Sequence, residues 1–279
     1  MEQSTANTAK VWFITGSSRG FGRVWTEAAL QRGDKVVATA RNVHSIADLK
    51  EKYGKRVLTL PLDITDPEQV KTAVATAHQH FGKLDIVINN AGYSLVGTVE
   101  EAKADEIRAL YDTNVLGPVS LIQAVLPIMR TQGYGHILGT SSNLGHFVIP
   151  MIGFYCSSKW AFEAIHESLA TEVKPFGIKV TIIEPGAYAT EFGSPQSLKF
   201  AENLPQYDAL RTAMFERIST YERGNPEATG AAILAVTDTA EPPLRLFLGS
   251  SNLEGIKQTY AERITVWEEW QHIAAAAQQ

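Results

Sequence analysis

The fold is decided near the N-terminus by the stretch Val11-Trp12-Phe13-Ile14-Thr15-Gly16-Ser17-Ser18-Arg19-Gly20-Phe21-Gly22. Its first five residues are apolar or β-branched, which is typical of a buried strand. The glycines then permit a tight turn, and the pattern from about Gly20 to Arg32 predicts a helix. This order suits the pyrophosphate of a dinucleotide, because backbone N–H groups and the helix dipole meet at the turn. The glycine spacing differs from G-x-G-x-x-G, so the turn alone is a weak signal.

The rest of the chain alternates apolar strands with helical patterns. Further strands are predicted at 35–39, 56–60, 84–88, 136–140, 179–183 and 244–248. Helices are predicted before residue 53 and at 66–81, 104–112, 115–131 and 153–173, and Asp66-Pro67 supplies an N-cap and a first-turn proline. Continuous apolar strands that alternate with helices indicate a parallel sheet covered on both faces. Because no linker or fixed-period repeat interrupts the pattern, we expect one α/β domain over residues 1–279.

Composition excludes several classes of function. The apolar fraction of 44%, the charged fraction of 20% and the net charge of −5 are those of an ordinary globular protein without a basic nucleic-acid footprint. No apolar run reaches membrane-spanning length, and residues 1–9 lack a signal core, so we expect a frayed tail, no membrane partner and a cytoplasmic location. Cys156 is the only cysteine, which excludes an intrachain disulfide and a cysteine-rich metal site; no metal is expected.

Tyr155 and Lys159 stand four residues apart at the start of the helix predicted over 153–173. Residues at this spacing share one helix face. A nearby ammonium favours the phenolate and should lower the tyrosine pKa from its usual value of about 10. Tyr155 is therefore a candidate general acid and base. The alternative is an aromatic residue and a lysine that merely share a face.

Six motifs together resemble the short-chain dehydrogenase/reductase family in its compact single-domain branch. They are T-G-x-x-x-G-x-G at 15–22, N-N-A-G at 89–92, a helix asparagine at Asn114, Ser142 thirteen residues before the tyrosine, Y-x-x-x-K at 155–159, and P-G-x-x-x-T at 185–190. They occur in the family's order. The resemblance implies a three-layer, doubly wound Rossmann fold with a seven-stranded parallel sheet in the order 3-2-1-4-5-6-7. The cofactor would lie across the switch point, at the carboxyl ends of the strands.

The resemblance also implies catalytic roles. Tyr155 would exchange a proton with the substrate oxygen, and Ser142 would hydrogen-bond the same oxygen. Lys159 would lower the tyrosine pKa and hold the nicotinamide ribose, while Asn114 would position a water for proton supply. Two alternatives stay open: Ser141 as the working hydroxyl, and Asn114 as a cap of the following helix.

NADP(H) is the expected cofactor. An NAD enzyme carries a carboxylate near the end of the second strand, whereas this chain reads Ala38-Thr39-Ala40-Arg41-Asn42. Arg41 suits a ribose 2′-phosphate, and Arg19 could close on it; the alternative is that both are surface charges. Asp63 resembles an adenine contact but is also a plausible turn aspartate. The full cofactor set is Gly16, Ser18, Arg19, Phe21, Gly22, Arg41, Asp63, Ile64, Asn90, Ala91, Gly92, Tyr155, Lys159, Pro185, Gly186 and Thr190.

The substrate pocket should form from the loops after the fourth, fifth and sixth strands. Its predicted walls are Tyr93, Leu95, Leu144, His146, Phe147, Met151, Tyr188 and Phe192, with Val96 and Phe154 beside them. These side chains are mostly apolar, which favours a bulky hydrophobic ketone, aldehyde or alcohol. His146 is the one group that could titrate near neutral pH, unless it simply faces solvent. Residues 193–223 are expected to form a lid.

The predicted activity is that of a carbonyl reductase or alcohol dehydrogenase, which transfers a hydride reversibly between NADPH and the carbonyl of a hydrophobic ketone or aldehyde. The alternative is a dinucleotide-binding redox sensor with little turnover. A sensor has no need of the full set Asn114, Ser142, Tyr155 and Lys159, so their presence favours the enzyme. A homodimer or homotetramer is a further expectation.

Overall fold

The computed structural model describes residues 9–195, 197–250 and 252–278. Its main sheet contains β1 (Val11–Ile14), β2 (Lys35–Ala40), β3 (Val57–Pro61), β4 (Ile86–Asn89), β6 (Gly135–Thr140), β7 (Ile178–Pro185) and β9 (Arg245–Leu248). All neighbours pair in parallel, in the order β3-β2-β1-β4-β6-β7-β9. The predicted seven-stranded sheet and its strand order are confirmed. The predicted tail falls mostly on residues 1–8, which lie outside the described residues.

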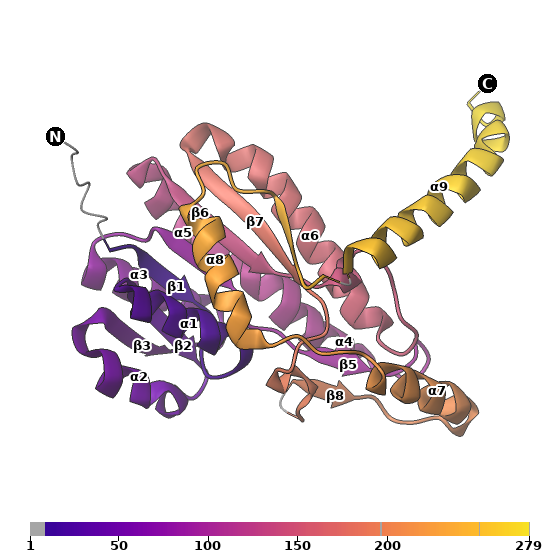
Figure 1. Cartoon of the computed structure of the whole chain (residues 1–279), viewed down its shortest axis with the longest axis horizontal. Coiled ribbons are helices and arrows are strands. Elements are labelled where there is room, and N and C mark those ends of the chain that lie inside the picture. Colours follow the sequence, from indigo (N-terminus) through magenta and orange to yellow (C-terminus); the bar gives the residue numbers. More distant parts are fainter. Residues whose placement is uncertain (1–8, 196, 251, 279) are drawn as a thin grey trace.

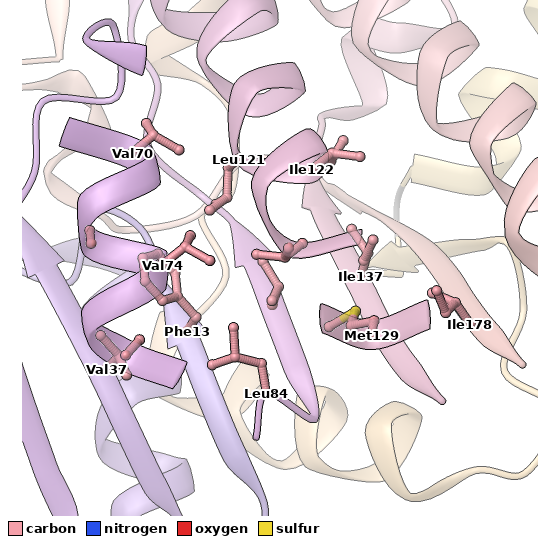
Figure 2. Close-up of a cluster of buried hydrophobic side chains, with 14 of the residues drawn as sticks. Phe13, Val37, Val70, Val74, Leu84, Leu121, Ile122, Met129, Ile137 and Ile178 are labelled. Atoms are coloured by element: carbon pink, nitrogen blue, oxygen red, sulfur yellow. The ribbon is translucent and has the colours of Figure 1, made fainter. Parts of the chain in front are cut away.

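Helices cover both faces of this sheet (Figure 1). One face carries α3 (Pro67–Phe81), α5 (Gly117–Gln132) and α6 (Gly153–Val173), and the other carries α1 (Gly20–Arg32), α2 (Ala47–Tyr53) and α8 (Thr229–Asp238). Alternation along β1 serves both layers, since Phe13 belongs to the first core cluster and Trp12 to the second. Figure 2 shows the first cluster, in which α3 and α5 bring Val74 and Leu121 to the sheet. The three-layer Rossmann architecture is therefore confirmed.

Local signals explain two of the helix ends. The side chain of Asp66 accepts hydrogen bonds from the N–H groups of Glu68 and Gln69 at 3.0 and 3.1 Å, so α3 begins at Pro67 as predicted. The predicted helix over 115–131 begins differently. A π-helical turn, Asp112–Leu116, joins α4 (Ala104–Tyr111) to α5. Such turns are rare and often mark functional positions.

Several elements were not predicted. β5 (Ser94–Val96) and β8 (Leu198–Phe200) form a second, two-stranded parallel sheet. The segment predicted as a lid contains β8 and the helix α7 (Asp208–Ser219) among its described residues. After β9 the chain continues into α9 (Asn252–Ala276), which extends away from the body of the molecule (Figure 1). None of the described helices is long and apolar enough to cross a bilayer.

Candidate active site

A cavity of about 1570 Å³ opens at the carboxyl ends of the main strands, beside the switch point between β1 and β4. Fifteen of the predicted cofactor residues line it: Gly16, Ser18, Arg19, Phe21, Arg41, Asp63, Ile64, Asn90, Ala91, Gly92, Tyr155, Lys159, Pro185, Gly186 and Thr190. Gly22 does not line it. It lies behind the turn, where an added Cβ would overlap the Gly16 carbonyl oxygen and come within 2.5 Å of the Asn90 amide nitrogen. Gly22 therefore shapes the turn and does not itself face the cavity.

The glycine turn is fixed by Thr15 and by the loop after β4. Gly16 and Gly20 adopt left-handed φ angles of 72° and 54°, which side chains other than glycine rarely adopt. The Thr15 hydroxyl oxygen accepts hydrogen bonds from the N–H groups of Asn90 and Ala91 at 2.9 and 3.1 Å. In return, the Asn90 amide donates to the Thr15 carbonyl oxygen at 2.9 Å. The turn therefore has one defined shape at the N-terminus of α1, which fits a pyrophosphate.

The start of α6 brings Tyr155 and Lys159 to the floor of the cavity. Both side chains are buried, and the hydroxyl groups of Tyr155 and Ser142 hydrogen-bond to each other. The Lys159 ammonium donates to the Thr140 carbonyl oxygen at 2.8 Å and lies 5.7 Å from the centre of the Tyr155 ring. Ser142 follows β6 and accepts a hydrogen bond from the N–H of Leu144 at 3.2 Å. Ser141 points elsewhere, since its hydroxyl donates to the Glu163 carboxylate.

The predicted pKa shift of Tyr155 is wrong for this structure. Burial raises the pKa of Tyr155 above its usual range, and the hydrogen bond with Ser142 only partly offsets this. Burial also lowers the pKa of Lys159 to about 8. The physical reason is geometric: the ammonium is bonded to the Thr140 carbonyl oxygen and is not at the phenol oxygen.

Asn114 lies inside the π-helical turn and does not line the cavity. Its amide donates to the Tyr93 carbonyl oxygen at 2.9 Å and to the Ser158 hydroxyl at 3.1 Å, and its oxygen accepts from the Tyr93 N–H at 3.1 Å. The alternative that Asn114 caps the following helix is therefore wrong. Its side chain instead ties the loop after β4 to α6, the helix that carries Tyr155 and Lys159.

Three charged residues surround the outer part of the cofactor region. Arg41 is exposed at the end of β2 and lines the cavity. Arg19 donates to the Ser197 hydroxyl at 2.9 Å and approaches the Glu191 carboxylate at 4.0 Å, so it contacts the segment after β7. Asp63 accepts hydrogen bonds from the N–H and hydroxyl of Thr65 at 3.0 and 2.8 Å. Asp63 is therefore a turn aspartate that also lines the cavity.

The outer walls of the cavity are largely apolar. Five predicted pocket residues line it, namely Tyr93, Leu144, Phe147, Tyr188 and Phe192, together with Val96. Sequence reasoning missed further wall residues: Ile149 and Ile152 from the loop before α6, and Met214, Phe215 and Ile218 from α7. For the three residues of α7, the signal would have been an apolar helix face within the predicted lid. The apolar and polar residues of α7 are only weakly separated between its faces, so this signal is faint.

Besides His146, which is described below, three residues predicted in or beside the pocket do not line the cavity. Leu95 lies between Ser94 and Val96 in β5, and strand alternation turns it to the opposite face, against Leu110. Met151 has a φ of 69° and packs under the pocket. Phe154 likewise packs away from the cavity, beside Leu95.

His146 belongs to a buried ionic cluster, so neither the pocket nor the solvent-facing prediction is correct. Its Nε2 lies 2.5 Å from a Glu184 carboxylate oxygen and 3.8 Å from a Glu163 oxygen. The Arg245 guanidinium Nε lies 3.3 Å from Glu184 and 3.6 Å from Glu163. His146, Glu163 and Glu184 each place one potential metal-ligand atom within 4.8 Å of the others. The positive charge beside these carboxylates comes from Arg245, which occupies the place where a cation would be needed.

Comparison with known sequences agrees with the motifs. The family model for short chain dehydrogenases matches residues 10–199. The chain is 39% identical over 272 residues to Oxidoreductase BOA17 of Botryotinia fuckeliana, covering 96% of this chain and 99% of the relative. It is 34% identical over 244 residues to a 3-ketodihydrosphingosine reductase of Bacteroides thetaiotaomicron, covering 86% of this chain and 88% of the relative.

Solved structures give the same result. A short-chain dehydrogenase from Streptomyces avermitilis superposes with a TM-score of 0.89 at 36% identity, covering 96% of this chain and all of the other. One from Burkholderia cenocepacia in complex with NADP has a TM-score of 0.74 at 25% identity, covering 94% and 97% of the two chains. At 22% identity, a relative from Burkholderia phymatum in complex with NAD shares the fold with a TM-score of 0.77, covering 89% and 92%. Since sheet order, motifs and relatives agree, the chain belongs to the short-chain dehydrogenase/reductase family of oxidoreductases.

Proposed function

We propose that this protein is a carbonyl reductase that transfers a hydride reversibly between NADPH and a hydrophobic ketone or aldehyde. The observation that carries the proposal is the hydrogen-bonded pair of hydroxyls, Tyr155 and Ser142, at the floor of a cavity with apolar outer walls. The nicotinamide supplies the hydride when it is bound. The glycine turn would hold its pyrophosphate, and Lys159 would hold its ribose.

Proton transfer falls to Tyr155. Because burial raises its pKa, the hydroxyl is protonated at neutral pH, which is the form that reduction of a carbonyl needs. Ser142 would donate a second hydrogen bond to the same oxygen and orient it. Alcohol oxidation needs the phenolate, so it depends on bringing the Lys159 ammonium closer to the phenol oxygen. This arrangement favours the reductive direction near neutral pH.

The choice of NADP rests on Arg41. Its guanidinium is exposed beside the cavity at the end of β2, where an NAD enzyme carries a carboxylate. None of the described residues forms an ion pair with it, so it is available to a 2′-phosphate. Arg19 is the second candidate, although it now contacts Ser197 and Glu191.

Arg41→Ala is expected to lower kcat/KM for NADPH by roughly 10–100-fold, because a hydrogen bond to a charged group contributes about 1.5–3 kcal/mol. The kcat/KM for NADH should change by less than about threefold, since NADH lacks the phosphate. Steady-state kinetics with both cofactors measure this, with Lys50→Ala on the exposed part of α2 as the control. Equal wild-type values for the two cofactors, or an unchanged preference in the variant, would defeat the assignment.

The substrate class rests on the outer wall. Phe147, Ile149, Met214 and Phe215 line it, and the Phe192 ring lies 5.7 Å from the ring of Tyr155. Burial of apolar surface contributes about 25 cal/mol per Å². A bulky hydrophobic carbonyl therefore fits this wall better than a sugar or a short keto acid.

Across a series of methyl ketones of rising chain length, kcat/KM should rise by about three- to fourfold per added methylene, the equivalent of about 0.8 kcal/mol. The rise should weaken in Met214→Ser, which removes apolar wall surface from α7. Initial rates of NADPH oxidation at fixed carbonyl chemistry provide the measurement. A flat series, or a preference for a small charged substrate, would remove these residues from the pocket.

The same proposal includes the organisation of the chain. We propose one domain over residues 1–279, with residues 193–223 closing over the substrate. We also propose a cytoplasmic homodimer or homotetramer. Exposed apolar side chains on α9, including Trp267 at 60% and Trp270 at 64% exposure, would give an assembly surface to bury.

A further inference from the structure

The serine loop, residues 141–152, is held mainly from behind, on the side away from the cavity. It leaves β6 and carries Ser142. Apart from the hydroxyl contact with Tyr155, the bonds of Ser142 are local: its hydroxyl donates to the Asn143 amide oxygen at 3.1 Å and accepts from the Leu144 N–H, and its carbonyl accepts from the Gly145 N–H at 2.9 Å. Local bonds of this kind fix the shape of a turn, so the place of the turn relative to Tyr155 rests on a single hydroxyl contact unless the loop is anchored elsewhere. The position of Ser142 therefore depends on what anchors the rest of the loop.

The first anchor is the buried ionic cluster, which we define as His146, Glu163, Glu184 and Arg245. His146, Glu163 and Glu184 are 6%, 4% and 0% exposed and come from the serine loop, α6 and β7. Arg245 in β9 approaches both carboxylates. Arg245 brings positive charge to both carboxylates, although it also pairs with Glu167 at 2.8 Å, and burial together with the charge of Glu184 raises the pKa of Glu163. A protonated His146 adds positive charge directly beside Glu184. Through His146, the cluster thus attaches the serine loop to β7 of the sheet and to α6.

Contacts at Glu163 tie the cluster closely to the catalytic residues. Glu163 lies one helical turn after Lys159 on α6, and it accepts a hydrogen bond from the Ser141 hydroxyl at 2.5 Å. A Cβ added at Gly145 would overlap the Glu163 carboxylate, so the loop backbone packs directly on that group. Ser141 and Gly145, the residues on either side of the turn that carries Ser142, therefore both contact the Glu163 side chain of α6.

The second anchor is α9, which lies far away in the sequence. The Tyr260 hydroxyl is 3.0 Å from His146 Nδ1, and Arg263 donates to the His146 carbonyl oxygen at 2.8 Å. The Arg263 guanidinium also stacks 5.0 Å above the ring of Trp160, whose indole N–H donates to the Leu144 carbonyl oxygen at 3.0 Å. The first half of α9 thus holds the loop in place, whereas the second half of the helix extends away from the body of the molecule (Figure 1).

We propose that His146 is a positioning residue for Ser142, locked between the buried ionic cluster and α9, so that the C-terminal helix sets the geometry of the catalytic serine. The role rests on the proposed reduction, in which Ser142 orients the carbonyl. It explains why a histidine next to the active site is turned away from the cavity. It also gives α9 a function in catalysis.

The charge state of His146 gives the cluster a pH dependence with a definite sign. Burial alone would lower the pKa of His146, but the hydrogen bond to Glu184 and the charges of Glu184 and Glu163 outweigh it and raise that pKa, against the opposing charge of Arg245. Tyr260 and Arg263 face the ring from α9. Because the pKa of His146 is higher in the folded protein than in the unfolded chain, its protonation stabilises the fold. This stabilisation is fully present below the unfolded-state pKa of about 6.5 and is lost as pH rises through the folded-state pKa.

His146→Gln is the test, because glutamine keeps hydrogen-bonding capacity but cannot carry the charge. We expect kcat for carbonyl reduction to fall by roughly 10–100-fold, the effect of a displacement of about 1 Å at a reacting group, with the Kd for NADPH unchanged within about twofold. Amide hydrogen exchange over residues 141–152 should become at least about tenfold faster. The difference in Tm between wild type and variant should be largest below about pH 6.5 and should shrink as pH rises.

His272→Gln is the matched control, since His272 is exposed near the end of α9 and should leave kcat, exchange and Tm unchanged. If His146→Gln fails to fold, Tyr260→Phe removes one hydroxyl and should change exchange and kcat in the same direction by a smaller factor. The positioning role would be overturned if amide hydrogen exchange in the loop of His146→Gln were as slow as in the wild type. It would also be overturned if exchange were faster but kcat stayed at the wild-type value. A wild type that reduces no carbonyl would instead defeat the proposed function, and the exchange result would still decide whether the cluster orders the loop.

Discussion

Tyr155→Phe is expected to lower kcat by roughly 10²–10⁴-fold, the usual contribution of a general acid, while the Kd for NADPH stays nearly unchanged. The substitution removes the hydroxyl that is bonded to Ser142 and keeps the ring, which packs in a buried apolar cluster. The raised pKa of Tyr155 keeps its hydroxyl protonated throughout the neutral range, which is the form that donates a proton during reduction. Single-turnover reduction at saturating NADPH measures the chemical step, and fluorescence titration measures cofactor binding.

Tyr188→Phe is the matched control, because Tyr188 also lines the cavity but lies beside Phe21 in the glycine turn, with ring centres 5.2 Å apart. Its kcat should stay within about threefold of wild type. If Tyr155→Phe kept more than about a tenth of the wild-type rate of the chemical step, Tyr155 would lose its assigned role.

Gly22→Ala is expected to produce the second large effect, a loss of both cofactor affinity and stability. The new Cβ would overlap the Gly16 carbonyl oxygen and lie 2.5 Å from the Asn90 amide nitrogen. Because both neighbours are fixed by hydrogen bonds at the turn, relief requires movement of the backbone that would hold the pyrophosphate. Overpacking of this kind costs about 1–3 kcal/mol of the free energy of unfolding.

We expect Tm to fall by several degrees, since about 1 kcal/mol corresponds to roughly 2–4 °C in a chain of this size class. The Kd for NADPH should rise at least about tenfold. Gly255→Ala is the control for Tm, because its Cβ would enter open space within α9, where alanine is the better helix former. A Gly22→Ala protein with wild-type Tm and cofactor affinity would show that the turn is not held as tightly as described.

The sequence predicts most of the sheet and the catalytic centre because their signals are local. The apolar runs, the glycine turn and the Asp66-Pro67 helix start each act within a few residues. The order of the seven main strands, which the family resemblance implied, is also confirmed. Tyr155 and Lys159 share a face because helix geometry requires it at their spacing. Their roles, together with those of Ser142 and Asn114, remain predictions that the variants above test.

What the sequence could not predict depends on contacts between distant segments. Leu95 was assigned to the pocket because the three residues of β5 are too few to reveal their alternation. His146 was misassigned because its partners Glu163, Glu184 and Tyr260 come from three separate elements. The pKa of Tyr155 was assigned the wrong direction because spacing shows that an ammonium is near but not which oxygen it contacts.

Hydride transfer itself tests the central claim most directly. NADPH that carries deuterium at both C4 positions of the dihydronicotinamide should be mixed with a bulky hydrophobic ketone, and the alcohol should be analysed by mass spectrometry. The account predicts one deuterium on the carbinol carbon with the wild type, and at least about a hundredfold less labelled alcohol with Tyr155→Phe in the same time. A wild type that binds NADPH tightly but transfers no deuterium to any carbonyl would contradict the account and favour a dinucleotide-binding redox sensor.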